Sequence, residues 1–230
     1  MRIYVEYEAE LLAALGLATD ASCDGVILQY GAPEQVLAST CRANILADDW
    51  LVDAESPGDV IVSWSGTLAG GLFESHPMTW LRPGREAFAE FCRRIGPQLE
   101  RHGKSMCFHP HSRHVLSDAA SCVQFAREQP ERGGPFSCAL APADLFEPGM
   151  LADMDNHLTR MFEMLGGLVT MVILRDVAIA PGERCEARPL GRGVLPRELV
   201  RALLRDHVPE QAPVVLGAAE LEGQLRWLGL

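Results

Sequence analysis

The chain has 230 residues, of which 48% are apolar and 22% charged, values typical of a soluble globular protein with one large α/β domain or two small ones. Its formal net charge of −11 disfavours nucleic acid and anionic membranes as partners, because both are bound through clustered Lys and Arg side chains. No apolar run approaches the ~18–20 residues that span a membrane, and residues 1–8 lack the apolar core of a signal peptide.

The seven cysteines are scattered, and no two are spaced as Cys-x-x-Cys. This spacing argues against a zinc knuckle or a redox motif, and thiols inside apolar segments behave as small hydrophobic residues. A reducing cytoplasm is the expected location, since thiols persist there. The expected partner is a small-molecule substrate, with no nucleic acid and no membrane, while the sequence does not indicate an oligomeric state.

The first third of the chain alternates between apolar segments typical of strands and segments with helical spacing. The predicted strands are Arg2–Tyr7, Gly25–Tyr30 and Asp59–Trp64, and residues 46–54 contain a weaker candidate. Helices are predicted through residues 11–17 and over Pro33–Leu46, where a proline near the first turn favours a helix start. A long Gly-rich loop, residues 65–83, follows the third strand.

The second part of the chain continues the alternation. Helix Gly84–His102 is the most regular element, because its apolar residues recur at helical spacing and form one stripe. The other predicted helices are Ser117–Arg127, Met150–Leu165, Pro196–Asp206 and Ala219–Leu228. The other predicted strands are Ser105–Phe108, Phe136–Ala141, Leu168–Leu174 and Pro213–Leu216.

Repeated strand–helix units with nearly continuous apolar strands predict a parallel sheet covered by helices. Seven clear strands and one weaker candidate suit a single (β/α)8 TIM barrel over residues 1–230, slightly trimmed relative to the typical ~250 residues. An open, doubly wound sheet is the alternative.

The most informative pattern is Met106–His114, where a short apolar run opens into three histidines within six residues. An apolar run bounded by Pro110 predicts a buried strand that ends there, and parallel sheets and barrels place ligands at the carboxyl ends of strands. Histidine suits both metal ligation and proton transfer near neutral pH. Because side chains alternate, only one of His109 and His111 should point into a barrel mouth. The alternative interpretation is a set of hydrogen-bonded loop histidines.

Six segments, in their order along the chain, carry a resemblance to a known family. They are Cys23–Leu28, Met106–His114, Phe136–Leu145, Met171–Asp176, Pro189–Val194 and Pro213–Leu216. In this order they resemble the xylose isomerase-like TIM barrels, which include sugar isomerases, epimerases, inosose dehydratases and endonuclease IV-like enzymes. The Met-Val-Ile-Leu-Arg-Asp segment, for example, is similar to a Val-His-Leu-Lys-Asp segment of that group. The resemblance implies a TIM barrel that acts on a sugar or polyol.

The resemblance also implies where a metal would lie. Relatives hold a divalent metal through Glu, Asp, His and Glu at four strand ends, and the corresponding positions here are His109, Ala141, Ile173 and Gly217. Ala, Ile and Gly side chains cannot coordinate a metal, and histidine favours softer metals than a carboxylate cage does. We therefore predict no cofactor and no metal ligands, with a divalent metal on His109 as the alternative. Because relatives also use two of the carboxylates to move a proton, the mechanism would have to be rebuilt.

Three polar residues near strand ends are further candidates. Asp144 lies three residues after the missing Asp position, where the resemblance places a substrate-contacting His. It would contact a substrate hydroxyl or cap the loop before the next helix. Arg175 and Asp176 end the most apolar strand, so they would lie in the barrel mouth or form a buried structural ion pair.

Candidates for substrate binding also occur in the loops. Arg192 flanks a Gly-rich turn and would neutralise an anionic substrate group or be solvated. Trp64 and His76 belong to the end of a strand and to the long loop after it, which would be a binding loop or an irregular surface segment.

The sequence thus predicts a sugar or polyol isomerase or epimerase acting on a small hydroxy-carbonyl compound. The predicted catalytic residues are His109, as base or metal ligand, with His111 and Asp176, while Arg175 would stabilise charge opposite the base. Asp144, Arg175, Trp64, His76 and Arg192 are the predicted substrate contacts. The alternative is a non-catalytic, metal-free relative that binds a small molecule or a partner protein. A nuclease is disfavoured, since neither a dense metal cluster nor a basic face is apparent.

Overall fold

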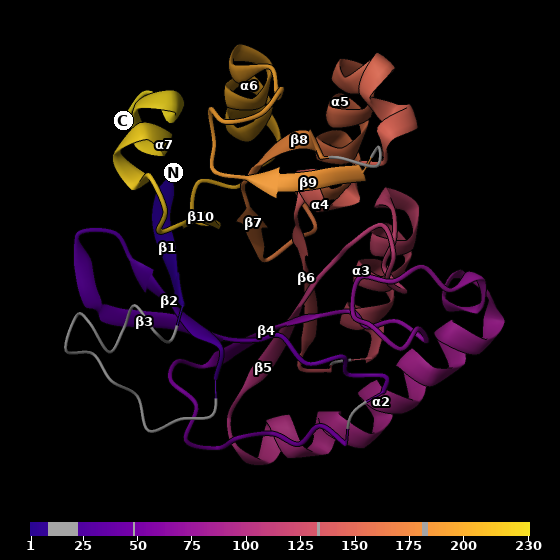
Figure 1. Cartoon of the computed structure of the whole chain (residues 1–230). Coiled ribbons are helices and arrows are strands. Elements are labelled where there is room, and N and C mark those ends of the chain that lie inside the picture. Colours follow the sequence, from indigo (N-terminus) through magenta and orange to yellow (C-terminus); the bar gives the residue numbers. More distant parts are fainter. Residues whose placement is uncertain (9–22, 48, 133, 181–183) are drawn as a thin grey trace.

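The computed structural model describes residues 1–8, 23–47, 49–132, 134–180 and 184–230, and its strands close into a barrel (Figure 1). The barrel strands are β1 (Arg2–Glu8), β2 (Gly25–Gln29), β3 (Ala32–Cys41), β4 (Val60–Trp64), β5 (Ser105–His109), β6 (Phe136–Leu140), β7 (Met171–Ile173) and β10 (Pro213–Gly217). Their order around the barrel is β1–β10–β7–β6–β5–β4–β3–β2. This confirms the predicted eight-stranded TIM-type barrel.

Helices lie on the outside of the barrel, with α2, α3, α5 and α6 covering much of its circumference in Figure 1. The helices are η1 (Pro77–Trp80), α2 (Arg82–Arg101), α3 (Ala119–Arg132), α4 (Pro142–Leu145), η2 (Pro148–Asp153), α5 (Met154–Leu165), α6 (Arg197–His207) and α7 (Leu221–Leu228). Four of the predicted helices therefore begin and end within a few residues of the prediction. The helix predicted from Met150 instead begins as the 3-10 turn η2 and becomes α-helical at Met154.

The predicted helix over Pro33–Leu46 is wrong, because residues 32–41 form strand β3. Gly31 has φ +81°, a conformation that glycine adopts without strain, and it turns the chain directly from β2 into β3. Strand β2 is therefore antiparallel to both neighbours, while the other neighbouring pairs in the barrel are parallel. The run Val36–Cys41 includes β-branched residues that favour strand over helix, and this preference outweighs Pro33.

The eighth strand is consequently β3, and the weaker candidate at residues 46–54 is not a strand. Of that segment the structure describes residues 46–47 and 49–54, which form turns and irregular backbone. The helix predicted through residues 11–17 lies outside the described residues. The strand predicted over Leu168–Leu174 is confirmed in its centre, where β7 covers residues 171–173.

An antiparallel pair of strands, β8 (Asp176–Ala180) and β9 (Arg184–Arg188), follows β7 and was not predicted. Residues of β9 alternate between exposed and half-buried, the pattern of a strand that covers a surface on one side. Figure 1 shows the pair beside α4, against which β9 packs. It therefore adds a wall beside the carboxyl end of β7.

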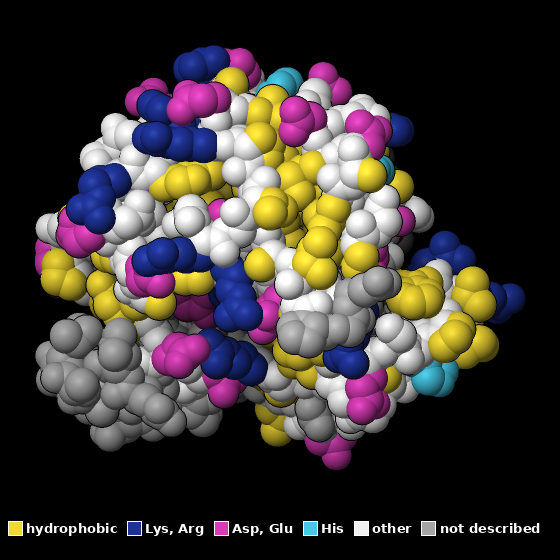
Figure 2. Space-filling view, turned by 45° about the horizontal axis from the view of Figure 1, so that its top comes forward, with side chains coloured by type: hydrophobic (Ala, Val, Ile, Leu, Met, Phe, Trp, Pro, Cys, Tyr) yellow, Lys and Arg dark blue, Asp and Glu magenta, His cyan; other side chains and the backbone are white. Residues whose placement is uncertain are grey.

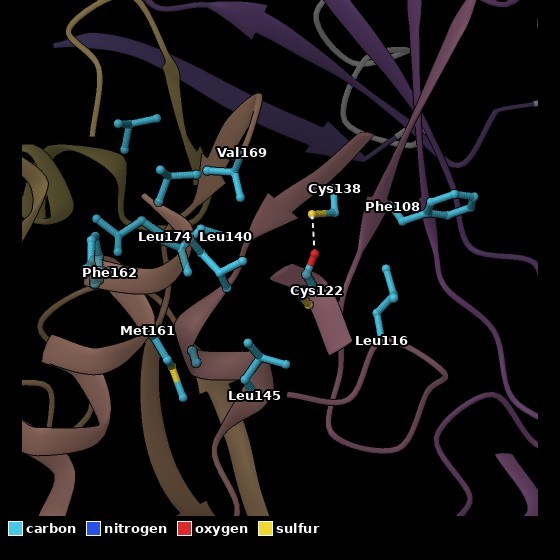
Figure 3. Packing of buried hydrophobic residues seen from close by; sticks show 14 of the residues in the cluster. Phe108, Leu116, Cys122, Cys138, Leu140, Leu145, Met161, Phe162, Val169 and Leu174 are labelled. Atoms are coloured by element: carbon cyan, nitrogen blue, oxygen red, sulfur yellow. Dashed lines mark hydrogen bonds between the residues drawn. The ribbon is translucent and has the colours of Figure 1, made fainter. Parts of the chain in front are cut away.

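The core consists of two layers on either side of the barrel strands. Side chains such as Tyr4, Val62, Cys107 and Met171 fill the barrel interior. The larger layer lies between strands and helices, and Figure 3 shows a part of it that includes Phe108, Leu116, Leu140, Phe162 and Leu174. Burial of each large apolar side chain contributes about 1.5–3 kcal/mol to the free energy that favours folding. These two layers therefore supply most of that free energy. Within the described residues, no helix combines the length and the apolar character needed to cross a membrane.

Candidate active site at the barrel mouth

The carboxyl ends of the parallel strands bring several polar side chains to one end of the barrel. Val62 and Cys107 point into the interior, and because side chains alternate, Trp64 and His109 also point inward, one layer further toward the mouth. Ile173 and Tyr4 are interior residues as well, which places Arg175 and Glu6 toward the same opening. The barrel geometry therefore assembles residues that are far apart in sequence.

His109 forms a buried pair with Asp144, which α4 supplies directly after β6. Nε2 of His109 lies 2.9 Å from Oδ2 of Asp144, and the two side chains are only 7% and 6% exposed. A carboxylate only accepts, so Nε2–H of His109 donates, and Nδ1 is the nitrogen that carries a lone pair whenever the ring is neutral. Burial by itself would raise the pKa of Asp144, but the nearby charges of His109 and Arg175 and this hydrogen bond lower it to about 2.

Five rings form an aromatic wall around this pair: Trp64, Phe73, His109, His111 and His114. Trp64 stacks on His109 with ring centroids 3.9 Å apart and planes at 22°. The edge of Phe73 meets Trp64 at 5.1 Å, and the rings of His111 and His114 lie 5.7 and 5.5 Å from it. Such packing fixes the orientation of the His109 ring.

His111 and His114 are neutral members of this wall. Burial lowers the pKa of His111 to about 4 and that of His114 to about 3. Nδ1 of His111 accepts from the Arg113 N–H at 3.1 Å, and Nε2–H of His114 donates to the Leu72 carbonyl at 2.8 Å. Both imidazoles are therefore uncharged near neutral pH.

The long loop predicted over residues 65–83 is tied to the histidine segment. Besides the bond from His114 to Leu72, Nη1 of Arg113 donates to the Phe73 carbonyl at 2.6 Å. Nε1 of Trp80, at the end of η1, donates to the Ser112 carbonyl at 3.1 Å. These bonds hold Phe73 against Trp64, so this part of the loop closes one side of the mouth.

Arg175 brings a positive charge to the mouth. Its Nη2 donates to Oε2 of Glu6 at 2.8 Å, and burial of the guanidinium is outweighed by Asp144, Glu6 and Glu8, which raise its pKa. Arg42 similarly pairs with Glu8 at 2.9 Å. Glu6, Glu8 and Arg42 were not among the site residues predicted from the sequence. Glu6 and Glu8, at alternate positions of an otherwise apolar first strand, are the sequence pattern that could have indicated site residues there.

Three adjoining cavities occupy the mouth. One of about 310 Å³ is lined by residues that include Thr40, Trp64, His109 and Arg175. One of about 640 Å³ shares Trp64 and Arg175 and adds His111 and Asp144, and a third, of about 470 Å³, shares Arg175. Figure 2 shows basic and acidic side chains alternating around a hollow in the face that it presents. A larger groove of about 930 Å³ lies between α2 and α3 in the helix layer, and none of these site residues lines it.

Asp176, predicted as catalytic, is placed differently from His109. It is fully buried, and its two carboxylate oxygens accept from the backbone N–H groups of Val177, Gly191 and Leu195, each at 2.9 Å. A Cβ on Gly193 would lie 2.4 Å from Oδ1 of Asp176, so the backbone closes tightly around the carboxylate. Asp176 lines none of the three mouth cavities. Its hydrogen-bond partners are thus backbone N–H groups, not the charged partner of the buried ion pair that the sequence left open.

The two other predicted contacts, Arg192 and His76, also lie outside the group at the mouth. Arg192 forms an exposed ion pair with Glu220. His76 precedes η1 and is half-buried. Neither residue lines the mouth cavities. The structure therefore brings together His109, His111, Asp144, Arg175 and Trp64 from the predicted set.

The residues at the mouth do not fit the four-ligand metal site of the xylose isomerase-like family that the sequence resembles. Ala141 and Ile173 are buried without a ligand atom, and a Cβ on Gly217 would meet nothing within 4 Å. Across the part of the chain that the structure describes, no three His, Cys, Asp or Glu side chains are grouped so that they could hold a metal ion. We therefore derive no chemical step through a metal.

Comparisons with known proteins extend to the fold alone. No family model matches the sequence, and no curated protein does. The probable 3-DHS dehydratase AsbF of Bacillus anthracis, involved in petrobactin synthesis, matches 85% of this chain and 77% of its own at a TM-score of 0.58 and 12% identity.

Two epimerases are more distant matches. D-psicose 3-epimerase, solved in the presence of D-fructose, matches 71% of this chain at a TM-score of 0.47 and 16% identity. L-ribulose 3-epimerase matches 77% at a TM-score of 0.48 and 12% identity. This chain covers 51% and 55% of those two chains, about half of their length.

The fold and the site together define a TIM barrel with a buried His–Asp pair at the carboxyl ends of its strands. More particularly, the closed barrel and its likeness to the AsbF structure show the TIM-barrel fold that the sequence predicted.

Proposed function

We propose that this protein is an isomerase or epimerase that moves a proton on a small hydroxy-carbonyl compound of the sugar or polyol class. The observation that carries the proposal is the 2.9 Å hydrogen bond between His109 and Asp144 beside the mouth cavities. A histidine oriented by a buried carboxylate is a recurring arrangement for a general base. The matched structures, which include two sugar epimerases and a dehydratase, are compatible with this class of substrate.

In the proposed reaction, Nδ1 of His109 removes the proton from the carbon next to the substrate carbonyl. The electron pair of the broken C–H bond forms the C=C bond of an enediolate, and the carbonyl oxygen takes the negative charge. Asp144 stays ionised, because its pKa is about 2, and stabilises the imidazolium that forms. Return of the proton to the former carbonyl carbon, with transfer of the hydroxyl proton to the enediolate oxygen, gives the isomer. Delivery of a solvent proton to the opposite face of the original carbon gives the epimer.

Arg175 would stabilise the enediolate. One guanidinium nitrogen is bonded to Glu6, and the group has further N–H donors for an oxygen in the cavity that it shares with His109. His111 would donate from its neutral Nε2–H rather than act as a cation, since its pKa is about 4. We assign no step to Asp176, whose oxygens are bonded to backbone N–H groups.

A non-catalytic relative that binds a small molecule or a partner protein is the second candidate. It is favoured by one observation, the absence of ligand atoms at Ala141, Ile173 and Gly217. For either candidate we propose a cytoplasmic location and no nucleic acid or membrane partner, on the grounds of cysteine usage and net charge.

Exchange of carbon-bound hydrogen with solvent tests the proposal directly. The protein is incubated in D2O with a panel of aldoses, ketoses and keto-polyols, and deuterium at the carbon next to the carbonyl is followed by NMR. We expect incorporation with the wild type and a loss of about 100-fold or more in His109→Gln. His102→Gln is the matched control, since His102 is an exposed histidine before the other end of β5.

The outcomes separate the two candidates. Exchange that is lost in His109→Gln and retained in His102→Gln supports the enzyme. Exchange that persists in His109→Gln contradicts the role of the His–Asp pair. Binding of panel members without exchange in the wild type favours the non-catalytic relative.

A further inference from the structure

Thr40 is a polar residue of the mouth to which the proposed reaction gives no part. It lies on β3 and pairs with the interior residue Val62 of β4, so its side chain points into the barrel. It is 5% exposed and lines the cavity of about 310 Å³ together with His109 and Arg175. Its hydroxyl has no hydrogen-bond partner. A buried hydroxyl without a partner is costly, so a ligand group that pairs with one at a cavity wall gains affinity.

Ser39, the preceding residue, also has a buried hydroxyl, but its side chain lies on the opposite face of β3 from that of Thr40. Its hydroxyl likewise has no hydrogen-bond partner. However, Ser39 pairs with Ile61, which belongs to the layer between strands and helices, so its side chain points away from the barrel interior. It does not line the mouth cavities. Of these two neighbouring hydroxyls, therefore, only that of Thr40 is within reach of a ligand in the mouth.

The surroundings leave the Thr40 hydroxyl available. Gly25 pairs with Thr40 on the intervening strand β2, and a Cβ at that position would lie 2.9 Å from Oγ1 of Thr40. The absence of a side chain at Gly25 thus leaves space beside the Thr40 hydroxyl. Rotation about χ1 exchanges the methyl and hydroxyl positions of threonine, so the oxygen can turn toward the cavity when a ligand offers a partner.

The two arginines that line the same cavity, Arg42 and Arg175, are each paired with a carboxylate. Arg175 is paired with Glu6 at 2.8 Å and Arg42 with Glu8 at 2.9 Å. Asp144 adds a further negative charge near Arg175. A phosphate group would therefore meet guanidinium groups that carboxylates already neutralise, whereas hydroxyl groups can donate to the carboxylates and accept from the arginines.

We propose that Thr40 and Glu6 form a hydroxyl-binding subsite, and that the mouth selects an uncharged polyhydroxy compound over its phosphate ester. This inference rests on the proposed function and specifies its substrate class. Glu6 accepts a substrate O–H while it holds Arg175, and Thr40 donates to or accepts from the next hydroxyl. The subsite fixes the compound relative to His109.

Isothermal titration calorimetry tests the subsite with D-fructose and other uncharged sugars and polyols of four to six carbons, each beside its monophosphate ester. We expect at least one uncharged compound to bind more tightly than its ester. Thr40→Val should raise its Kd about five- to tenfold, and Thr40→Ser should restore much of the affinity. Thr40→Val should also raise the Tm of the ligand-free protein by about 2–4 °C, because an unpaired buried hydroxyl is removed.

Ser39→Ala is the matched control, since it removes the neighbouring unpaired hydroxyl on the other face of β3. It should raise the Tm similarly and leave the Kd unchanged. Equal Kd values for wild type and Thr40→Val, tighter binding of the esters, or no binding of any uncharged compound would each overturn the subsite. Thr40-dependent binding without His109-dependent exchange would support the subsite and count against the proposed reaction instead.

Discussion

Asp144 and Asp176 are two buried aspartates that follow apolar strands, and they have opposite relations to the barrel. Asp144 is bonded to the titratable side chain of His109 beside the mouth cavities. Asp176 accepts hydrogen bonds from backbone N–H groups of the next residue and of residues 191 and 195, and so ties the start of β8 to the segment after β9. A carboxylate whose partners are backbone amides stabilises a loop, whereas one whose partner is an imidazole at a cavity can tune a proton transfer. Burial alone does not distinguish the two.

The largest expected effect is on catalysis at the Asp144 side. Asp144→Asn removes the charge that stabilises a protonated His109 and permits the wrong tautomer, so the rate of hydrogen exchange should fall about 100- to 10,000-fold. The assay is the deuterium exchange described above. Asp176→Asn, measured at a temperature where it is folded, should keep most of the rate. Equal losses in the two variants would remove the distinction between the aspartates.

The next effect is on stability at the Asp176 side. An Asn in place of Asp176 directs an amide N–H at backbone donors that now share two carboxylate oxygens. We expect a loss of about 3 kcal/mol in the free energy of unfolding, measured by urea denaturation. Asp49→Asn, which changes an exposed carboxylate in an irregular segment, should leave the midpoint unchanged. A midpoint for Asp176→Asn close to that of the wild type would contradict a stabilising role for these hydrogen bonds.

The mouth should also determine how stability depends on pH. The folded-state pKa values of His111 and His114, about 4 and 3, lie below the value of 6.5 for an ordinary histidine. Below pH 6.5 the unfolded chain therefore binds protons that the folded chain excludes, and each histidine costs about 1.4 kcal/mol per pH unit until its folded pKa is reached.

Asp144 adds to this loss at lower pH. Its folded pKa of about 2 lies below the ordinary 3.8, so its contribution is complete above pH 4 and is lost as the pH falls toward 2. Urea unfolding between pH 7 and pH 4 checks the histidine part. His111→Gln should reduce the slope by the equivalent of about one proton, whereas exposed His102→Gln should not change it. An unchanged slope in His111→Gln would show that His111 is not held neutral.

The smallest expected effect concerns the ring that holds His109. Trp64→Leu removes the stacking partner at 3.9 Å, and we expect the exchange rate to fall about fivefold, in line with the modest energy of an aromatic contact. Trp64→Phe should recover much of the rate. A rate that does not respond to Trp64→Leu would show that Asp144 by itself orients the imidazole.

Much of the fold could be predicted from the sequence, because apolar periodicity and strand length are local properties. Helix α2 and strands β4, β5, β6 and β10 were predicted within a few residues. Strand β3 was not, since Pro33 suggested a helix start, and the turn at Gly31 that pairs β2 with β3 depends on contacts with both neighbouring strands. The pair β8–β9 was also missed, because its short strands are stabilised by packing against α4.

The sequence by itself determined the barrel class and the importance of the His109 segment, because an apolar strand that ends in histidines is a local pattern. The tertiary structure decided which residues His109 meets. Asp144 is 35 positions away along the chain, and Glu6 is 169 positions from Arg175. Only the pairing of β5 with β6, and of β10 with both β1 and β7, brings these groups within hydrogen-bonding distance. The tertiary structure also separates Asp176 from the mouth cavities and places Thr40 at the wall of one of them, and sequence spacing gives no signal for either.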